Sequence, residues 1–492
     1  MLPARGCAVE RGLSAATDDP EGPTQAKTDR WVDALVATCV GLALRLGAVA
    51  WAGGGSMPGD ATFYRKLAQR LAEGHGYTWS WPDGAVTPAA HYPVGFPALL
   101  ALFDRTCTLF GAAPGDALRH PWAAQAFTAV LSAAAIPIVF ALVARSTSRR
   151  RTPAIAAWMM AIHPGLVLYA PALMSEGPTA TLLAGAALLA ARARDASRTR
   201  AWAWIALMGI ACGVATAIRP QSLLFAPVLA MLATLSREGV GARSARAGGA
   251  ATLALAMALA VCAPWTVRNC REMGRCALVS VNGGWNLLIG TQPSATGGWA
   301  ELETPMACRE VLGEADKDAC FEREARALIL RDPVRWVALA PAKLDATFDY
   351  AGAGPWWLHA SRPDRFGERA KVITAAFETL FERLVLLAAA LAVARLGPKR
   401  AWGRALVVVA CIFTIQIHAW PAFAALALGA FGLDARLRGA FLAKATGIAI
   451  AVTIGVHAAF FGGGRYQVVL FPLLVALASL LFEPSPAAKE VA

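Results

Sequence analysis

The stretch GDATFYRKLAQRLAEGHGYTWSWPDGAVTPAAHYPVGFP spans residues 59–97 and follows directly after the first long apolar segment of the chain. We therefore expect it to emerge at a membrane surface. Asp60 is predicted to cap a short helix over residues 61–73, because aspartate is among the preferred residues at the N-cap position. Gly74 ends that helix, and a second surface helix is predicted over residues 98–111.

The predicted first helix carries an apolar stripe in line with Asp60. Tyr64, Leu67, Ala68 and Leu71 follow the acid at three- and four-residue spacing, which is the pattern of a helix that lies on a membrane. A carboxylate at that boundary can meet both a lipid-borne and a water-borne substrate. The alternative is a purely structural role, since a lone aspartate before a helix is more often a cap than a catalyst.

The composition indicates a polytopic membrane protein. Of the 492 residues, 57% are hydrophobic and only 16% are charged, which excludes an ordinary soluble enzyme. The net charge of +13 comes with arginines that stand in short clusters between apolar spans. That arrangement is typical of cytoplasmic loops under the positive-inside rule and argues against binding of nucleic acid.

The fold class predicted from these patterns is an all-α polytopic membrane protein of about twelve transmembrane helices. Amphipathic helices are expected on its outer face, together with a small extracytoplasmic α-rich domain. The expected spans are residues 31–52, 121–144, 153–170, 176–191, 202–218, 222–235, 250–264, 374–393, 405–419, 422–432, 440–461 and 467–482.

Basic residues predict the orientation of these spans. Loops 145–151, 192–200 and 237–246 are rich in arginine, whereas the alternate turns carry only one basic residue, Arg219. The positive-inside rule therefore places both chain ends and the basic loops in the cytoplasm and Asp60 outside. The expected location is the bacterial cytoplasmic membrane, with the active site on the extracytoplasmic side.

The expected organisation has five parts, because the apolar periodicity stops once in the middle of the chain. Within the middle segment, helices are predicted over residues 301–330 and 332–348. The parts are a disordered cytoplasmic tail (1–30), an N-terminal transmembrane half (31–264) that contains the first outer loop (53–120), an extracytoplasmic segment (265–370), a C-terminal transmembrane half (371–482) and a cytoplasmic tail (483–492).

Four of the ten cysteines lie in the extracytoplasmic segment. Cys270 and Cys276 are separated by five residues, and Cys308 and Cys320 by eleven. Zinc binding is an alternative, but the segment has no CxxC spacing and no histidine near these cysteines. In an oxidising compartment we expect two short-range disulfides, Cys270–Cys276 and Cys308–Cys320.

Three charged residues stand at or near the outer ends of predicted spans. Glu176 begins a span, where it either favours the positive end of the helix after a Ser175 cap or has a functional role. Arg219 ends a span on the same side, where a phosphate can be held. Arg45 interrupts the first span and either reaches the lipid headgroups or faces a cavity.

Several short motifs, taken in order along the chain, resemble those of the GT-C polytopic glycosyltransferases. The nearest branch is the family 39-like one that includes protein O-mannosyltransferases and lipid A aminoarabinose transferases. The motifs are Asp60 with Tyr64, a Gly-x-Gly-Tyr turn at 74–77, YPVGFP at 92–97, PWTVRN at 264–269, NGGWNLLIG at 282–290 with ATG at 295–297, and Arg465-Tyr466 with Pro472.

The resemblance implies a transferase that uses a polyprenyl-phosphate-linked sugar donor. In that family the acidic residue of the first outer loop lies in the active site, which makes Asp60 the candidate catalytic residue. It would take the proton from the acceptor hydroxyl while the sugar carbon is attacked opposite the phosphate, so a single displacement inverts that carbon. Arg465, Arg219 and Arg268 are the candidates for binding the leaving phosphate.

The resemblance also implies a substrate site and leaves the metal question open. Many relatives carry a second acidic residue beside the first, whereas Ala61 follows Asp60 here. A divalent metal ion is therefore an open alternative, with Asp60, Asp83 and His91 as its candidate ligands. The residues expected to bind substrate are Tyr64, Tyr92, Glu176, Asn282, Asn286 and Tyr466.

The expected partners are the lipid-linked donor, the bilayer and a glycan, lipid or protein acceptor. Two other classes of function remain alternatives. One is a transporter or flippase of lipid-linked saccharides, which predicts charges deep in several spans and symmetry between the two halves. The other is a non-catalytic membrane protein of cell-envelope assembly.

Overall fold

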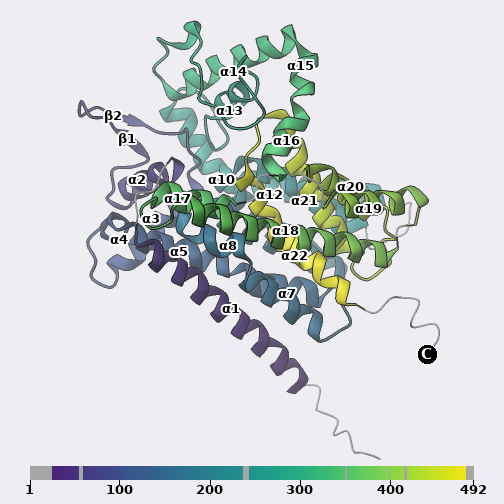
Figure 1. The fold of residues 1–492 in the computed structure, drawn as a ribbon. Helices are drawn as coiled ribbons and strands as arrows, with labels where there is room; N and C mark the ends of the chain where they lie inside the picture. The colour runs from purple at the N-terminus through teal and green to yellow at the C-terminus, as the bar shows by residue number, and fades with distance from the viewer. Residues whose placement is uncertain are drawn as a thin grey trace, which may run out of the picture.

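The computed structural model describes residues 25–54, 59–235, 243–349, 352–397, 399–414 and 418–483. Almost all regular structure in this part is helical (Figure 1). The strands found in it are β1 (Thr78–Ser80) and β2 (Val86–Pro88), which form an antiparallel hairpin within the first outer loop. The predicted all-helical class is thus confirmed for the described residues, apart from this hairpin.

In the described part, six helical segments are long and apolar enough to cross a membrane. A seventh is a bent pair whose axes differ by 42°. It consists of α7 (Arg151–Ala161) and the segment Pro164–Ala172, formed by α8 (Pro164–Tyr169) and η1 (Ala170–Ala172). The six are Trp31–Ala52 within α1 (Gln25–Ala52), Pro121–Ala144 formed by α5 (Pro121–Ala133) and α6 (Ala135–Ala144), α10 (Arg198–Ile218), Ala245–Glu272 within α12 (Arg243–Glu272), α21 (Ala440–Ala459), and Gly464–Phe482 formed by η4 (Gly464–Leu470), α22 (Phe471–Ser479) and η5 (Leu480–Phe482).

The prediction of about twelve spans is not confirmed. Three predicted spans correspond to apolar helices that are shorter than the roughly 20 residues needed to cross a bilayer. They are Pro220–Leu235, formed by η2 (Pro220–Leu224) and α11 (Phe225–Leu235), then α19 (Ala401–Phe413) and α20 (Trp420–Phe431). Two longer helices, α9 (Glu176–Asp195) and α18 (Glu368–Leu396), are not among the apolar spans.

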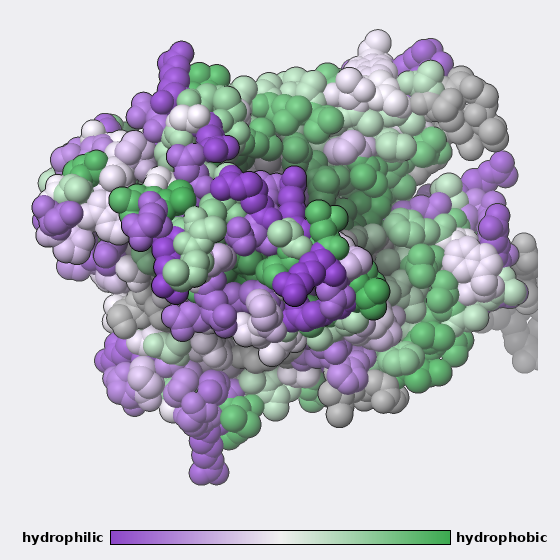
Figure 2. Space-filling model, turned by 90° about the horizontal axis from the view of Figure 1, so that it is seen from above, coloured by the Kyte–Doolittle hydropathy of each residue, from purple (hydrophilic) through white to green (hydrophobic). Residues whose placement is uncertain are grey.

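The outer loop and the extracytoplasmic segment supply shorter elements. The predicted helix over residues 332–348 is divided at Leu339, because Pro341 has no amide to continue the hydrogen-bond pattern. Figure 2 looks down on this end of the molecule, where hydrophilic residues gather beside apolar surface. The elements are α2 (Asp60–Ala72), α3 (Gly95–Thr108), α4 (Asp116–Arg119), η1 (Ala170–Ala172), α13 (Gly283–Ile289), η3 (Met306–Cys308), α14 (Glu314–Arg331), α15 (Pro333–Ala338), α16 (Ala340–Phe348) and α17 (Ala353–Ser361).

The apolar stripe of α2 packs against protein, not lipid. Tyr64, Leu67 and Ala68 are buried in the interior of the first loop, where α2 lies against α3. The prediction of a helix resting on the membrane by this stripe is therefore wrong. An amphipathic pattern shows that one face is removed from water, but it does not tell whether lipid or protein covers that face.

Arg45 is also buried inside the protein. Its guanidinium donates to the carbonyls of Gly41, Ala161 and Met160, two of which end α7 at the bend before α8. Neither predicted role, at the headgroups or toward a cavity, is found. Arg45 instead satisfies the carbonyl groups that the bend leaves without helical partners.

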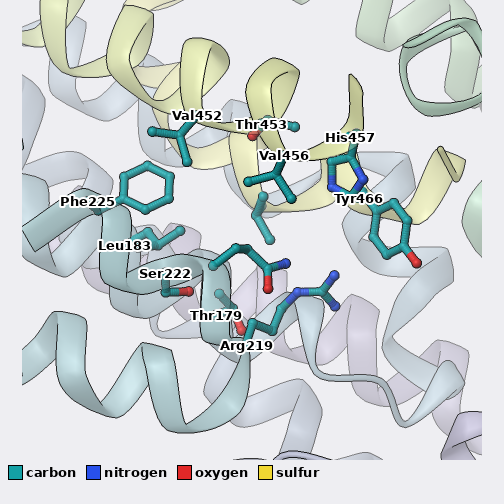
Figure 3. A pocket seen from close by; sticks show the side chains of 12 residues that line it. Thr179, Leu183, Arg219, Ser222, Phe225, Val452, Thr453, Val456, His457 and Tyr466 are labelled. Atoms are coloured by element: carbon teal, nitrogen blue, oxygen red, sulfur yellow. The ribbon is translucent and has the colours of Figure 1, made fainter. Parts of the chain in front are cut away.

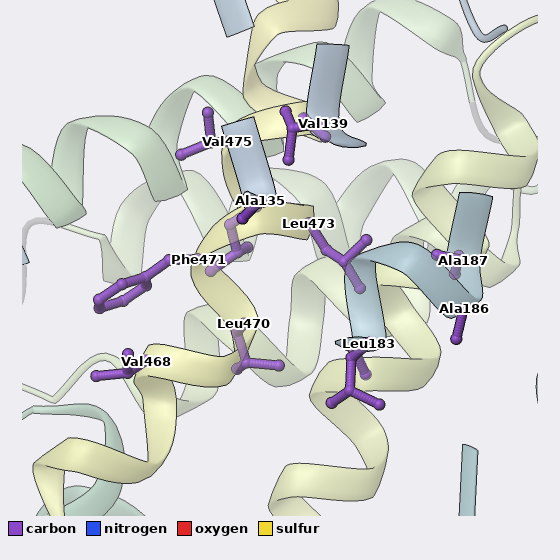
Figure 4. Packing of buried hydrophobic residues seen from close by; sticks show 14 of the residues in the cluster. Ala135, Val139, Leu183, Ala186, Ala187, Val468, Leu470, Phe471, Leu473 and Val475 are labelled. Carbon is purple, nitrogen blue, oxygen red and sulfur yellow. The ribbon is translucent and has the colours of Figure 1, made fainter. Parts of the chain in front are cut away.

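The helices of the two halves meet in one large apolar core. Figure 4 shows a part of it, in which Leu470 and Leu473 from the end of the chain lie near Leu183 of α9 and Ala135 of α6. Alanine and glycine at many contacts let the helix backbones approach closely. A side chain at Gly95 would lie 2.5 Å from the backbone of Ala217, so α3 sits directly against the end of α10.

The predicted tails lie mostly outside the described residues. Residues 1–24 and 484–492 are not among them, and α1 already begins at Gln25, inside the predicted tail of residues 1–30. The structure joins the cysteines of the outer segment in the predicted pairs, Cys270–Cys276 and Cys308–Cys320.

We expect both disulfides to be recovered by peptide mapping without reduction. Closing such short loops contributes on the order of 2–3 kcal/mol to local stability. Cys107, a free and half-buried cysteine of α3 outside the candidate spans, is the internal control and should be alkylated in the folded protein. Alkylation of Cys270, Cys276, Cys308 and Cys320 in the unreduced protein would contradict the pairing.

Candidate active site

Asp60 is the first residue of α2 and not its N-cap. Gly59 holds the capping position with a φ of 59°, a left-handed conformation that favours glycine. The Asp60 carboxylate accepts hydrogen bonds from two side chains, from the Tyr92 hydroxyl at 3.2 Å and from Arg465 Nη1 at 2.7 Å. The predicted capping alternative is therefore wrong, because both oxygens of the carboxylate face other parts of the chain.

Arg465 lies between two carboxylates. It belongs to η4, at the start of the last candidate span, and its Nε atom is 3.6 Å from Glu176 Oε1. The side chains of Asp60 and Arg465 remain 27% and 23% exposed, so this ion pair lies within reach of a ligand. The structure thus brings together two residues that the sequence placed far apart.

Glu176 is the first residue of α9, and its side chain is fully buried. Its Oε1 atom accepts a hydrogen bond from Arg219 Nη1 at 2.7 Å, and its Oε2 atom accepts one from the Tyr169 hydroxyl at 3.0 Å. Ser175 also accepts a bond from Arg219, at 3.2 Å. The four charges therefore alternate in space in the order Asp60, Arg465, Glu176 and Arg219.

The Tyr466 ring supports both arginines. The guanidinium carbons of Arg219 and Arg465 each lie 5.2 Å from the centre of this ring, within the range of a cation–π contact. His457 stacks on Tyr466 with the ring centres 4.2 Å apart. The planar guanidinium groups are thus held in place by rings as well as by carboxylates.

The surroundings keep Asp60 ionised and Tyr92 protonated. Burial raises the pKa of Asp60, but the positive charge of Arg465 and the hydrogen bonds from Arg465 and Tyr92 outweigh it and lower the pKa below its ordinary value. Burial and the negative charge of Asp60 raise the pKa of Tyr92. A carboxylate with a tyrosine donor on one oxygen is a competent acceptor for a further proton.

A narrow groove with a cavity volume of about 20 Å³ adjoins this charged cluster at Arg219 and Tyr466. Figure 3 shows Arg219 directed toward Tyr466 and His457 at one end, with Phe225 and Val452 toward the other. Most of the lining is apolar and comes from α9, α11 and α21. The groove therefore joins a positively charged end to a hydrocarbon-like wall.

Two other predicted residues have different surroundings. Arg268 donates to the backbone carbonyls of Ala89 and Tyr77, at 2.7 and 2.8 Å, so it holds the first outer loop and does not join the charged cluster. Tyr64 is buried, and its ring packs edge-on against Tyr92 and Phe96. Tyr64 supports the cluster through Tyr92.

The predicted Asn-Gly-Gly segment packs against protein. Asn282 accepts a hydrogen bond from Ser280 at 2.9 Å, and Asn286 lies one helical turn later in α13. A side chain at Gly284 would lie 2.0 Å from the carbonyl oxygen of Asp318. The glycine thus lets α13 approach α14, and the structure brings neither asparagine into contact with Asp60.

The predicted metal ligands do not come together. Asp83 lies in the exposed hairpin turn and accepts from the Ala85 amide, while the His91 ring packs against Trp285 and Tyr92. Asp60 already has a cation on one oxygen. Because these donors do not meet at one point, they do not fit a shared metal ion.

Within the described residues, one group of possible metal ligands lies close together, formed by Asp345, Asp349 and His418. His418 Nδ1 is 3.0 Å from an oxygen of each carboxylate. Asp349 also accepts a hydrogen bond from the Ala419 amide. These contacts join the end of α16 to the start of α20 as an ion-pair network.

Tyr169 and His457 were not among the residues predicted for the site. Tyr169 precedes Glu176 by seven residues at the end of a short helix, and His457 ends α21. Neither stands in a motif, and the only signal was a polar group near the outer end of an apolar segment.

The comparisons with known proteins identify one family match. The family model described as dolichyl-phosphate-mannose-protein mannosyltransferase matches residues 115–237 of the chain, which include Glu176 and Arg219. No curated protein is significantly similar. The match leaves Asp60 and Arg465 outside the aligned region.

The comparison with solved structures finds an oligosaccharyltransferase from Archaeoglobus fulgidus, with TM-scores below 0.5. One, AglB in complex with an inhibitory peptide and a dolichol-phosphate, is 14% identical with a TM-score of 0.49 and covers 92% of this chain and 50% of its own. Another, in complex with Zn and sulfate, is 15% identical with a TM-score of 0.46 and covers 91% and 48%. This chain therefore spans about half the length of these proteins. The predicted resemblance to the protein O-mannosyltransferase branch is confirmed by the family match over residues 115–237.

Proposed function

We propose that this protein is a membrane glycosyltransferase that moves a sugar from a polyprenyl-phosphate donor to an acceptor hydroxyl, with inversion at the sugar carbon. The observation that carries the proposal is the position of Arg465 between Asp60 and Glu176, on the Tyr466 ring that also lines the groove with Arg219. A lipid-linked phosphate needs such a combination of cations and apolar wall. The reaction would take place on the extracytoplasmic face of the bacterial cytoplasmic membrane.

Asp60 is the general base in this proposal. Its carboxylate accepts the proton of the acceptor hydroxyl as the oxygen attacks the sugar carbon, and the bond from that carbon to the phosphate oxygen breaks. Tyr92 donates to one carboxylate oxygen and Arg465 to the other, so both donors fix the direction of the carboxylate, and the acceptor proton goes to one of its remaining lone pairs. The low pKa of Asp60 keeps the base ionised at neutral pH.

Arg465 and Arg219 receive the charge that develops on the leaving phosphate. Their guanidiniums lie over the same Tyr466 ring, and both contact the Glu176 carboxylate. Glu176 thus acts by fixing the two arginines, not by touching the sugar. Arg268 is left out of the phosphate site, because backbone carbonyls already occupy its donors.

The acceptor and the sugar follow from the family match alone. The matched family is described as acting on protein with dolichyl-phosphate mannose. We infer a hydroxyl-bearing protein acceptor and a hexose donor for this chain, in preference to a glycan or lipid acceptor. A suitable probe pair is radiolabelled polyprenyl-phosphate mannose and a peptide rich in serine and threonine.

Replacing Asp60 with asparagine tests the base. The Asp60→Asn variant keeps the size of the side chain, so we expect normal accumulation in the membrane and a fall in kcat of about a hundredfold or more. Transfer of label from polyprenyl-phosphate mannose to the peptide is the measurement. Asp83→Asn, the same change in an exposed turn of the same loop, is the matched control and should keep full activity. Wild-type turnover by Asp60→Asn would disprove the role of Asp60.

Changes at Arg465 test the coupling between the base and the phosphate site. Arg465→Lys keeps the charge but loses the forked hydrogen bonds, so it should be less harmful than Arg465→Ala. Without the arginine, burial dominates and the pKa of Asp60 rises. The acid limb of the pH profile of kcat/KM should then move to higher pH, since the base must be deprotonated. If the acid limb of the pH profile did not move in Arg465→Ala, Arg465 would not act on Asp60. Arg326→Ala, on the exposed face of α14, serves as the control.

The orientation is tested by labelling single cysteines in intact cells with a reagent that does not cross membranes. Probes at Ala85 and Ser294, both exposed at the outer end, should react, whereas a probe at Ser197 should not. The reason is the excess of arginine in the loop around Ser197. Reaction at Ser197 in sealed cells would reverse the orientation and place the site in the cytoplasm.

A further inference from the structure

Glu314 makes three hydrogen bonds from the outer segment to the first loop. It is the first residue of α14, and its Oε1 atom accepts from Trp79 Nε1 at 2.6 Å. Its Oε2 atom accepts from the amides of Ala90 and His91, at 2.6 and 2.9 Å. Bonds to an ionised carboxylate are among the stronger hydrogen bonds in proteins. One side chain thus binds both the hairpin and the segment directly before Tyr92.

The carbonyl groups of the same segment accept hydrogen bonds from three further donors. Ala89 accepts from Arg268 Nη1 at 2.7 Å, and Ala90 accepts from the Val281 amide at 2.9 Å. The Tyr77 hydroxyl donates to the carbonyl of Tyr92 at 2.8 Å. The backbone from Ala89 to Tyr92 is therefore held by the first loop itself, by α12 and by the outer segment.

Tyr92 connects this backbone segment to Asp60. Its ring stacks on Phe63 with centres 5.1 Å apart and meets Tyr64 edge-on, which fixes the direction of the hydroxyl. That hydroxyl donates to Asp60 Oδ1 at 3.2 Å. A shift of the backbone at His91 would move the hydroxyl with it, since the ring is rigid.

We propose that Glu314 is a positioning residue, which sets the place of the Tyr92 hydroxyl and through it the direction of the Asp60 carboxylate. The inference rests on the proposed function, because it gives Glu314 an effect on catalysis only if Asp60 is the base. It makes the outer segment a part of the active-site machinery, although Glu314 touches neither the base nor the phosphate site. Small errors in the placement of a catalytic group lower kcat more than they weaken binding.

The variant Glu314→Gln tests the proposal. Glutamine has one acceptor oxygen and an NH2 group, so it cannot accept from the Trp79 side chain and from both amides together. We expect kcat to fall about tenfold with KM for polyprenyl-phosphate mannose unchanged within about twofold, as for a misplaced catalytic group. Asp316→Asn is the matched control. It changes an acid on the same helix whose exposed ion pair with Arg275 does not contact the first loop, and it should keep the wild-type kcat.

A double-mutant cycle with Tyr92→Phe separates positioning from a general structural effect. Phenylalanine removes the hydroxyl through which Glu314 acts, so Glu314→Gln should lower kcat by less than about twofold in that background. A full tenfold loss in the Tyr92→Phe background would overturn the proposal, as would a Glu314→Gln enzyme with the kcat of Asp316→Asn. If Glu314→Gln does not accumulate, Glu314→Asp replaces it in the same cycle with the same criteria. Failure of the proposed function has a different signature, namely full activity of Asp60→Asn.

Discussion

The carboxylates of Asp60 and Glu176 and the guanidiniums of Arg219 and Arg465 lie together at one end of the helical bundle. The rest of the structure depends on the neutralisation of these charges by one another. Glu176 is fully buried, and an isolated charge in such a place is expensive. Its bonds to Arg219 and Tyr169 satisfy it, while Arg465 connects it to Asp60. The carboxylates hold the arginines in position, and Arg465 keeps Asp60 ionised.

The four charged residues come from distant parts of the sequence, so helix packing must bring these parts to defined positions relative to one another. Arg465 and Asp60 are separated by 405 residues, and their contact exists only because η4 is held against α9 and the first loop against α10. The close approach of Gly95 to Ala217 leaves little freedom between α3 and the end of α10, where Arg219 stands. Small residues at the helix contacts thus determine where the charges lie.

Charged contacts join the predicted outer loop (53–120) to the predicted extracytoplasmic segment (265–370). Arg268 binds the loop through its carbonyls and Glu314 through its amides. The short hairpin and the aromatic rings around Tyr92 have few regular hydrogen bonds of their own, so these charged contacts replace the pairing that a larger sheet would supply. The Asp60 carboxylate thus stands on a loop whose backbone is fixed by these contacts.

The sequence alone determined the class of the protein and several of its parts. A long apolar segment with few charges is stable in the hydrocarbon core of a bilayer. The candidate spans around α1, α10, α12 and α21 could therefore be predicted from composition. The spacing of the cysteines predicted their pairing, and short motifs led to Asp60 and Arg465. In each of these cases the information lies in neighbouring residues.

Only the tertiary structure decided how the side chains meet. Arg45 was a candidate to face a cavity and Arg268 to bind a phosphate, but both donate to backbone carbonyls. The apolar stripe of α2 was expected to face lipid, but it packs against other parts of the protein. Glu176 and Arg219 form a pair that no local pattern reveals, and Tyr169 and His457 stand in no motif. The count of about twelve spans is not confirmed. Hydropathy describes the composition of a segment, whereas the direction of a side chain and the neighbour that covers it depend on packing between segments far apart in the chain.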